Sequence, residues 1–420
     1  MTKSAVGMVS DVPGRTRRVF LSRIESVRGL AALAVAVGHT MGYLVVHEGT
    51  GRTLLDQPDW ENAIEKLASG LIYGETAVII FFVMSGVVIA RSLDSRSGRI
   101  HAGRDYVSFL IRRMLRLYPA HIVAMVGILA IAWVFLIDQP PIDFSAFPDS
   151  APEENAEAAG WLNGIVFNPL KWKSIIANFT MASWSMNLVV WSLYVEVLAA
   201  PLLPLFHAAA RKENRWLDAL VLGGLIALSL LNWQHLWSRY LFAFYLGMMV
   251  ESHGVVLAAH AARWFGGPRR ALAMLYLVMM LPNTFAAERT PAIILLESFA
   301  AFAIISAIVR SEGTSHFRSL ERPLLRWNGR LSYSFYLWHL WLMTIAVRAL
   351  YASLPAAVME DWEETLVLAV AALTIVAALA IAQVSYKFIE LPGIALGRRL
   401  VGLWRGISQR RLAGKTSRAD

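Results

Sequence analysis

Five ionisable residues lie inside long apolar stretches of this chain, where each is costly unless it has a partner or a function. They are His39, Glu196, Arg239, Glu297 and His339. Histidine and glutamate side chains transfer protons near neutral pH when their surroundings tune them. An ionisable group in a membrane helix is therefore a functional hypothesis, set against the plainer interpretation of a hydrogen bond between helices.

Arg28 and His39 belong to one face of the first apolar stretch. They are eleven residues apart, which in a helix is about three turns and about 16 Å of rise. At about 100° per residue, their directions differ by only about 20°. We expect Arg28 at the cytoplasmic mouth of this helix and His39 near the centre of the membrane.

Glu196 and His339 are expected at a similar depth. His339 lies about nine residues into its own apolar stretch, and Glu196 enters from the opposite side. Together with His39 they suit either acid–base catalysis or a proton relay. Spacing alone leaves both open, along with simple hydrogen bonding between helices.

A second group of candidates is the cluster Arg112, Arg113 and Arg116 in the segment RRMLRLYP. Arginine binds phosphate through two parallel hydrogen bonds, so three closely spaced guanidinium groups suit a phosphate-rich ligand. Basic residues also gather at the cytoplasmic ends of membrane helices, where they set topology and touch anionic lipids. Both interpretations stand.

The elements that carry these residues are predicted to be membrane-spanning helices. Of the 420 residues, 57% are hydrophobic and 16% are charged, whereas a soluble domain is about a quarter charged. The predicted fold is all-α, a polytopic integral membrane protein of about ten transmembrane helices. Apolar stretches of roughly spanning length begin near Gly29, Ala77, Leu117, Leu188, Trp216, Leu236, Ala271, Ala292, Leu331 and Thr365.

The distribution of charge predicts the orientation of the chain. Lys and Arg concentrate in alternate connecting segments, among them residues 91–116, 310–330 and 387–418, while residues 138–157 are acidic. By the positive-inside rule the basic segments and both termini are cytoplasmic. The net charge of +9 thus reflects topology, and no nucleic-acid partner is expected.

A single membrane domain is predicted to fill most of the chain. It covers residues 23–392 and includes an extracytoplasmic loop, 138–185. A basic cytoplasmic segment, 1–22, precedes it, and a basic cytoplasmic tail, 393–420, follows. The chain has no Cys, which excludes disulfides, cysteine metal sites and an acyl-cysteine intermediate, and no metal site is expected.

Six segments resemble, in order, the signature elements of the acyltransferase 3 family of membrane proteins. The first is RIESVRGLAALAVAVGH, which ends at His39, and the second is GETAVIIFFVMSGVVIA. The third is RRMLRLYP, and the fourth is WSLYVEVLAAPLLP. The last two are GRLSYSFYLWH, which ends at His339, and YKFIELP. Glu25 stands where this family commonly has Asp.

The resemblance implies the transfer of an acyl group, usually acetyl, from cytoplasmic acyl-CoA to a hydroxyl. His39 is then the general base, Glu196 its orienting carboxylate, and Arg28 the third member of the catalytic set. The residues expected to bind substrate or acyl-CoA are Arg112, Arg113, Arg116, Ser85, Gly86, Ser192, Trp191, Tyr333 and His339. For Ser85 and Gly86, close helix packing by small residues is an equal alternative. Acyl-CoA, acetyl-CoA by preference, is a co-substrate, and no permanently bound cofactor is expected.

No esterase-like domain follows the predicted helices, and in this respect the chain resembles the stand-alone branch of the family. We therefore expect a multi-pass protein of a bacterial inner membrane, in contact with membrane lipids. Its acceptor is expected to be a glycan or lipid-linked sugar, with a small hydroxylated metabolite less favoured. The alternatives are a proton-coupled transporter that uses His39, Glu196 and His339 as a relay, and a non-catalytic scaffold or sensor. Consumption of acyl-CoA distinguishes the enzyme from both.

Overall fold

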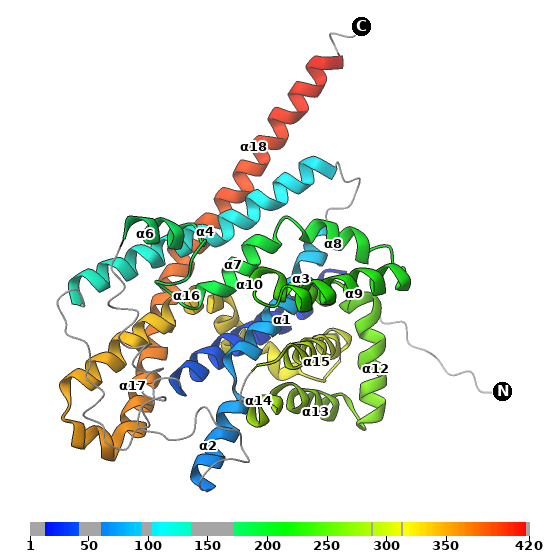
Figure 1. Ribbon diagram of the computed structural model, residues 1–420. Helices are drawn as coiled ribbons and strands as arrows, with labels where there is room; N and C mark the ends of the chain where they lie inside the picture. Colours follow the sequence, from blue (N-terminus) through cyan, green and yellow to red (C-terminus); the bar gives the residue numbers. More distant parts are fainter. Residues whose placement is uncertain are drawn as a thin grey trace.

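A computed structural model describes residues 13–41, 60–94, 102–135, 171–286, 289–311 and 314–416 (Figure 1). Helices account for nearly all of these residues, and no strand occurs in them, so the all-α prediction is confirmed for this part of the chain. The elements are α1 (Pro13–Met41), α2 (Trp60–Leu71), α3 (Gly74–Asp94), α4 (Ala102–Phe135), α6 (Trp172–Phe179), α7 (Val190–Ala199), α8 (Leu203–Ala210), α9 (Arg215–Leu231), α10 (Leu236–Arg239), α11 (Leu241–Met248), the π-helix η3 (Val250–Gly254), α12 (Val255–Trp264), α13 (Pro268–Met280), α14 (Pro282–Phe285), α15 (Pro291–Arg310), the 3₁₀-helix η4 (Arg318–Glu321), α16 (Pro323–Ser353), α17 (Ala356–Ser385), the π-helix η5 (Tyr386–Glu390) and α18 (Leu391–Thr416).

Four helical segments within the described ranges are long and apolar enough to cross a membrane. They are Gly74–Asp94, Asp105–Trp133, Pro291–Arg310 and Thr365–Trp404. Two bent pairs qualify if each pair forms one span: α7 with α8, bent by 62°, and α10–α11 with η3–α12, bent by 55°. Length and composition therefore support four to six spans in the described part of the chain.

The remaining predicted spans are helical but less clear-cut. A helix overlaps or directly follows each of the ten predicted starting points. However, α9 has 17 residues and α13 only 13, against about 20 for a straight crossing, and α1 and α16 carry internal arginines. The count of ten spans and the orientation of the termini thus stay predictions. The predicted segment 1–22 and loop 138–185 lie largely outside the described residues, and α6 forms within the described end of that loop.

α1 and α16 cross backbone to backbone near the centre of the molecule. A Cβ atom added to Gly29 would lie 2.6 Å from the backbone nitrogen of Gly329, and one added to Gly329 would collide with the carbonyl oxygen of Glu25. Only residues without a side chain allow helices to approach so closely. This contact fixes the two helices that carry Arg28, His39 and His339.

A second glycine contact joins α3 to α11. A Cβ on Gly86 would collide with the carbonyl oxygen of Phe244, and one on Gly247 with the carbonyl oxygen of Val83. The face of α3 that carries Gly86 is therefore filled by α11. Several neighbours of Gly86 on α3, among them Ser85, line the cavity described below.

Candidate active site

A cavity of about 340 Å³ lies between α1, α3, α4, α7, α16 and η5. This is near the lower end of the range for ligand pockets, about 300–1,000 Å³. Its wall carries four arginines and three glutamates: Arg28, Arg113, Arg116, Arg330, Glu25, Glu196 and Glu390. Serines, tyrosines and apolar side chains line the rest, and most of the apolar ones come from α3. With more arginines than glutamates in its wall, the cavity suits a ligand with an anionic end.

The carboxylate of Glu196 is held on both oxygens. Nη2 of Arg113 donates to Oε2 at 2.9 Å, and the Ser85 hydroxyl donates to Oε1 at 3.2 Å. The two charged side chains are only 12% and 16% exposed, so the pair neutralises two charges that would be costly to bury alone. α3, α4 and α7 thus meet at one ion pair in the cavity wall.

Two further charges are anchored in the wall by neutral groups. Nη2 and Nε of Arg28 donate to the Gly329 carbonyl oxygen at 2.8 and 3.3 Å. The Ser334 hydroxyl donates to Oε2 of the buried Glu390 at 3.1 Å. Glu390 belongs to η5, a single π-helical turn of the kind that often occurs at functional sites.

Two tyrosines of α16, Tyr333 and Tyr336, line one wall of the cavity. The hydroxyls of Tyr336 and Ser192 lie 2.9 Å apart, and the Tyr333 hydroxyl donates to the Leu117 carbonyl oxygen at 2.6 Å. These bonds connect α16 to α7 and α4. They also fix two phenol groups that face the cavity.

His39 and His339 lie next to each other behind this wall. Their ring centroids are 5.6 Å apart with an interplanar angle of 30°. His339 is 1% exposed and its ring lies 5.7 Å from that of Tyr336, which lines the cavity. Tyr336 and His339 are three residues apart and so share one face of α16. The structure therefore juxtaposes two imidazoles, which can carry protons, with an arginine-lined cavity.

The family model for an acyltransferase domain, acyltransferase 3, matches residues 21–385. The chain belongs to the acyltransferase 3 family. No curated protein and no solved structure matches it. Family membership and the apolar helices together identify this chain as a membrane acyltransferase. The fold positions the candidate residues of that activity as follows.

Most of the residues predicted from sequence for this acyltransferase meet at the cavity. The seven in its wall are Arg28, Ser85, Arg113, Arg116, Ser192, Glu196 and Tyr333. His39 and His339 form the adjacent pair. Glu196, the carboxylate predicted to orient His39, instead binds Arg113 and Ser85. The ring that lies beside His39 is that of His339.

Three predicted residues belong neither to the cavity wall nor to the histidine pair. Arg112 turns away, because consecutive residues of a helix point about 100° apart, and its backbone packs against α18, with its Cα 3.5 Å from a Cβ added to Gly397. Gly86 serves the contact between α3 and α11, which was the alternative for this residue. Trp191 packs against Tyr240, with ring centroids 5.5 Å apart, in an aromatic cluster.

Five ionisable residues of the cavity were not predicted as site residues: Glu25, Arg330, Tyr336, Tyr386 and Glu390. All five lie within the quoted signature segments, so their position in those segments was an available signal. Arg330 directly follows Gly329 at the start of the α16 segment.

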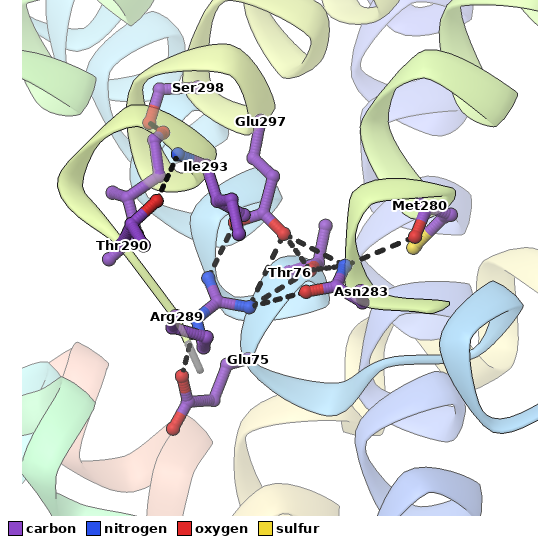
Figure 2. A network of polar contacts seen from close by, with 10 residues as sticks. Glu75, Thr76, Met280, Asn283, Arg289, Thr290, Ile293, Glu297 and Ser298 are labelled. Carbon is purple, nitrogen blue, oxygen red and sulfur yellow. Dashed lines mark hydrogen bonds and ion pairs between the residues drawn. The ribbon is translucent and has the colours of Figure 1, made fainter. Parts of the chain in front are cut away.

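A separate polar network surrounds the fully buried carboxylate of Glu297 on α15 (Figure 2). Thr76 and Asn283 donate to its Oε1, and Nη2 of Arg289 donates to Oε2. The Arg289 guanidinium lies between Glu297 and Glu75, whose Oε2 is 2.9 Å from Nε (Figure 2). Burial alone would lower the pKa of Arg289, but the two carboxylates raise it above its ordinary value. This network links α3, α14 and α15 and explains Glu297 as a structural charge.

Proposed function

We propose that this membrane acyltransferase transfers an acetyl group from cytoplasmic acetyl-CoA to a hydroxyl of a glycan or lipid-linked sugar. The observation that carries the proposal is the position of the arginine-lined cavity against the His39–His339 pair. An anionic ligand with a long thin arm, such as CoA, suits the cavity. A base for a hydroxyl proton suits the histidines.

The arginines of the cavity are our candidates for the CoA phosphates. Arg113 and Arg116 are three residues apart on α4 and share a face, and Arg330 approaches from α16. Because Arg113 already binds Glu196, Arg116 and Arg330 are the candidates for direct phosphate contact. Arg28, on the same stripe of α1 as His39, marks the route of the pantetheine arm.

In the proposed reaction, His39 accepts the proton of the acceptor hydroxyl as the oxygen attacks the thioester carbon. The tetrahedral intermediate carries an oxyanion, and a hydroxyl donor placed at that oxygen would stabilise it. Tyr336 is our candidate, since it lies on the wall beside His339. Collapse of the intermediate breaks the carbon–sulfur bond, and the protonated His39 returns its proton to the CoA thiolate. Glu196 contributes by holding Arg113.

The proposal places both termini in the cytoplasm of a bacterium, with the protein in its inner membrane. A reporter active only in the cytoplasm should function when fused after Asp420. A reporter active only outside should function when inserted in the loop 138–185. The opposite pattern would overturn the orientation and the cytoplasmic donor with it.

Two measurements test the function itself. Mass spectrometry of surface glycans and lipid-linked sugars should find an acetyl group that a deletion strain lacks and its complemented parent restores. Calorimetry should detect binding of acetyl-CoA to the purified protein, weakened about tenfold to a hundredfold by Arg116→Gln, since a charge-assisted hydrogen bond contributes about 1.5–3 kcal/mol. The control is Arg326→Gln, because Arg326 is an exposed arginine at the end of α16 that also carries the cavity residue Arg330. No acetyl-CoA binding, and no release of CoA, would favour the transporter.

A further inference from the structure

We propose that His339 is the positioning residue for His39, and that it fixes the tautomer of the base through a neutral hydrogen-bond acceptor instead of a carboxylate. This inference rests on the proposed function of His39. It assigns to His339 a defined role in the chemical step, whereas the family resemblance placed this residue among those that bind substrate.

The hydrogen bonds of His339 define its own tautomer. Its Nδ1 lies 3.0 Å from the carbonyl oxygen of Tyr336 and 3.3 Å from that of Phe335. A carbonyl oxygen only accepts, so Nδ1 must carry the proton. No carboxylate contacts the ring among the described residues, and burying an uncompensated charge is costly, so the imidazole is neutral. A neutral imidazole has one donor and one acceptor nitrogen. Nε2 is therefore the acceptor.

That acceptor nitrogen is buried and unused. Nε2 of His339 has no hydrogen-bond partner in the described part of the chain, although the residue is 1% exposed. A buried polar atom without a partner costs about 1–3 kcal/mol and calls for an explanation. Catalytic hydrogen bonds are often long in a free enzyme and shorten when substrate binds. We explain the unpaired Nε2 as a hydrogen-bond acceptor for a donor group that lies nearby.

The neighbouring ring that can supply this donor is His39. Two imidazole rings joined by a nitrogen–nitrogen hydrogen bond of about 3 Å have centroids separated by that length plus the two ring radii. The separation observed between His39 and His339, 5.6 Å, is of this order. His39 is the more accessible ring of the two, since it is only partly buried. If one nitrogen of His39 donates to His339, the other nitrogen carries the lone pair. That lone pair points away from His339 and is the one that accepts a proton from a hydroxyl.

The orientation of His339 is held firmly enough for this role. Its ring stacks on Phe335, with centroids 5.3 Å apart and an interplanar angle of 15°, and its Nδ1 is bound to the backbone of its own helix. The α1–α16 crossing at Gly29 and Gly329 holds together the two helices that carry the histidines. Glu196 is not available for the same task, since both of its oxygens bind other groups.

The proton inventory of the step balances without any change on His339. The acceptor hydroxyl gives its proton to the second nitrogen of His39, and His39 later gives it to the CoA thiolate. His339 keeps its Nδ1 proton throughout and only accepts a hydrogen bond from His39. It therefore acts on the geometry and tautomer of the base, and it forms no bond to substrate.

Steady-state kinetics with acetyl-CoA, following CoA release by membranes that hold the full-length protein, test this role. His339→Leu should lower kcat about 10- to 100-fold, as losing an orienting partner typically does, with the KM for acetyl-CoA unchanged. His339→Gln, whose Oε1 can replace Nε2 as an acceptor, should recover most of the loss. Met343→Leu, a volume-conserving change one turn along the same helix, is the control. Equal kcat in His339→Leu and wild type would overturn the inference, as would a loss in His339→Gln as large as that in His339→Leu.

A second measurement does not depend on turnover. Solid-state nuclear magnetic resonance of the full-length protein, labelled with ¹⁵N in its histidine rings, reports the tautomer of His39, whose signals are those lost in His39→Gln. A single neutral tautomer in wild type that becomes a mixture in His339→Leu supports the inference. An unchanged spectrum in His339→Leu overturns it. If wild type releases no CoA, the proposed function fails, and this spectrum still decides the role of His339.

Discussion

Arg113 on α4 and Glu196 on α7 form an ion pair with 2.9 Å between Nη2 and Oε2, in the wall of the cavity proposed to hold the donor. Both side chains are mostly buried. Removing one partner of a buried pair leaves an unpaired charge and typically costs about 3–5 kcal/mol, whereas removing both costs much less.

Arg113→Gln should therefore lower the thermal stability of the purified protein, and adding Glu196→Gln should restore most of it. The double variant should still bind acetyl-CoA more weakly than wild type, because it lacks a cavity arginine. Thermal unfolding and calorimetry in detergent measure the two effects separately. If the two stability losses simply add, the residues are not energetically coupled and this pair does not shape the cavity.

The network around Glu297 makes a second prediction, about stability alone. Arg289→Gln leaves a fully buried carboxylate without its cation and should destabilise the protein by about 3–5 kcal/mol. Glu75→Gln removes the other partner of Arg289, but Glu75 is 48% exposed, so its loss should cost no more than about 1 kcal/mol. Thermal unfolding of the two variants gives the comparison. Equal destabilisation would show that Glu297 does not depend on Arg289.

The crossing of α1 and α16 gives the third prediction. Gly329→Ala places a methyl group against the Glu25 carbonyl oxygen, so the helices must separate and the two histidines with them. We expect loss of both CoA release and thermal stability. Gly224→Ala is the matched control, since nothing lies within 4 Å of a Cβ added there in the middle of α9, and it should be neutral or gain up to about 1 kcal/mol. A fully active, stable Gly329→Ala protein would contradict the close crossing.

Helical periodicity was enough to predict part of the site. Arg28 and His39 share a stripe of α1 in the sequence, and in the structure one lines the cavity while the other lies behind it. The same periodicity separates Arg112 from Arg113 and Arg116, because residues i and i+3 share a face and neighbouring residues do not. The arginine cluster could therefore have been divided correctly from the sequence alone.

The partners of these residues could not be predicted in the same way. Whether Glu196 meets His39 or Arg113 depends on the rotation of α7 and on its distance from α1, which no pattern within one helix specifies. Glu390 is turned into the cavity by the π-helical turn η5, and a single wide turn breaks the 3.6-residue period on which such predictions rest. The pairing of His39 with His339 likewise required the crossing of two helices far apart in sequence.

The measurement that tests the account most directly is the rate of CoA release from acetyl-CoA by purified His39→Gln. Glutamine keeps hydrogen bonding but is not a base, so kcat should fall by about 10²–10⁴-fold. Acetyl-CoA binding by calorimetry should match wild type, because the arginines of the cavity are intact. Activity above a tenth of wild type at equal folded concentration would contradict the assignment of His39 as the base of this acyltransferase.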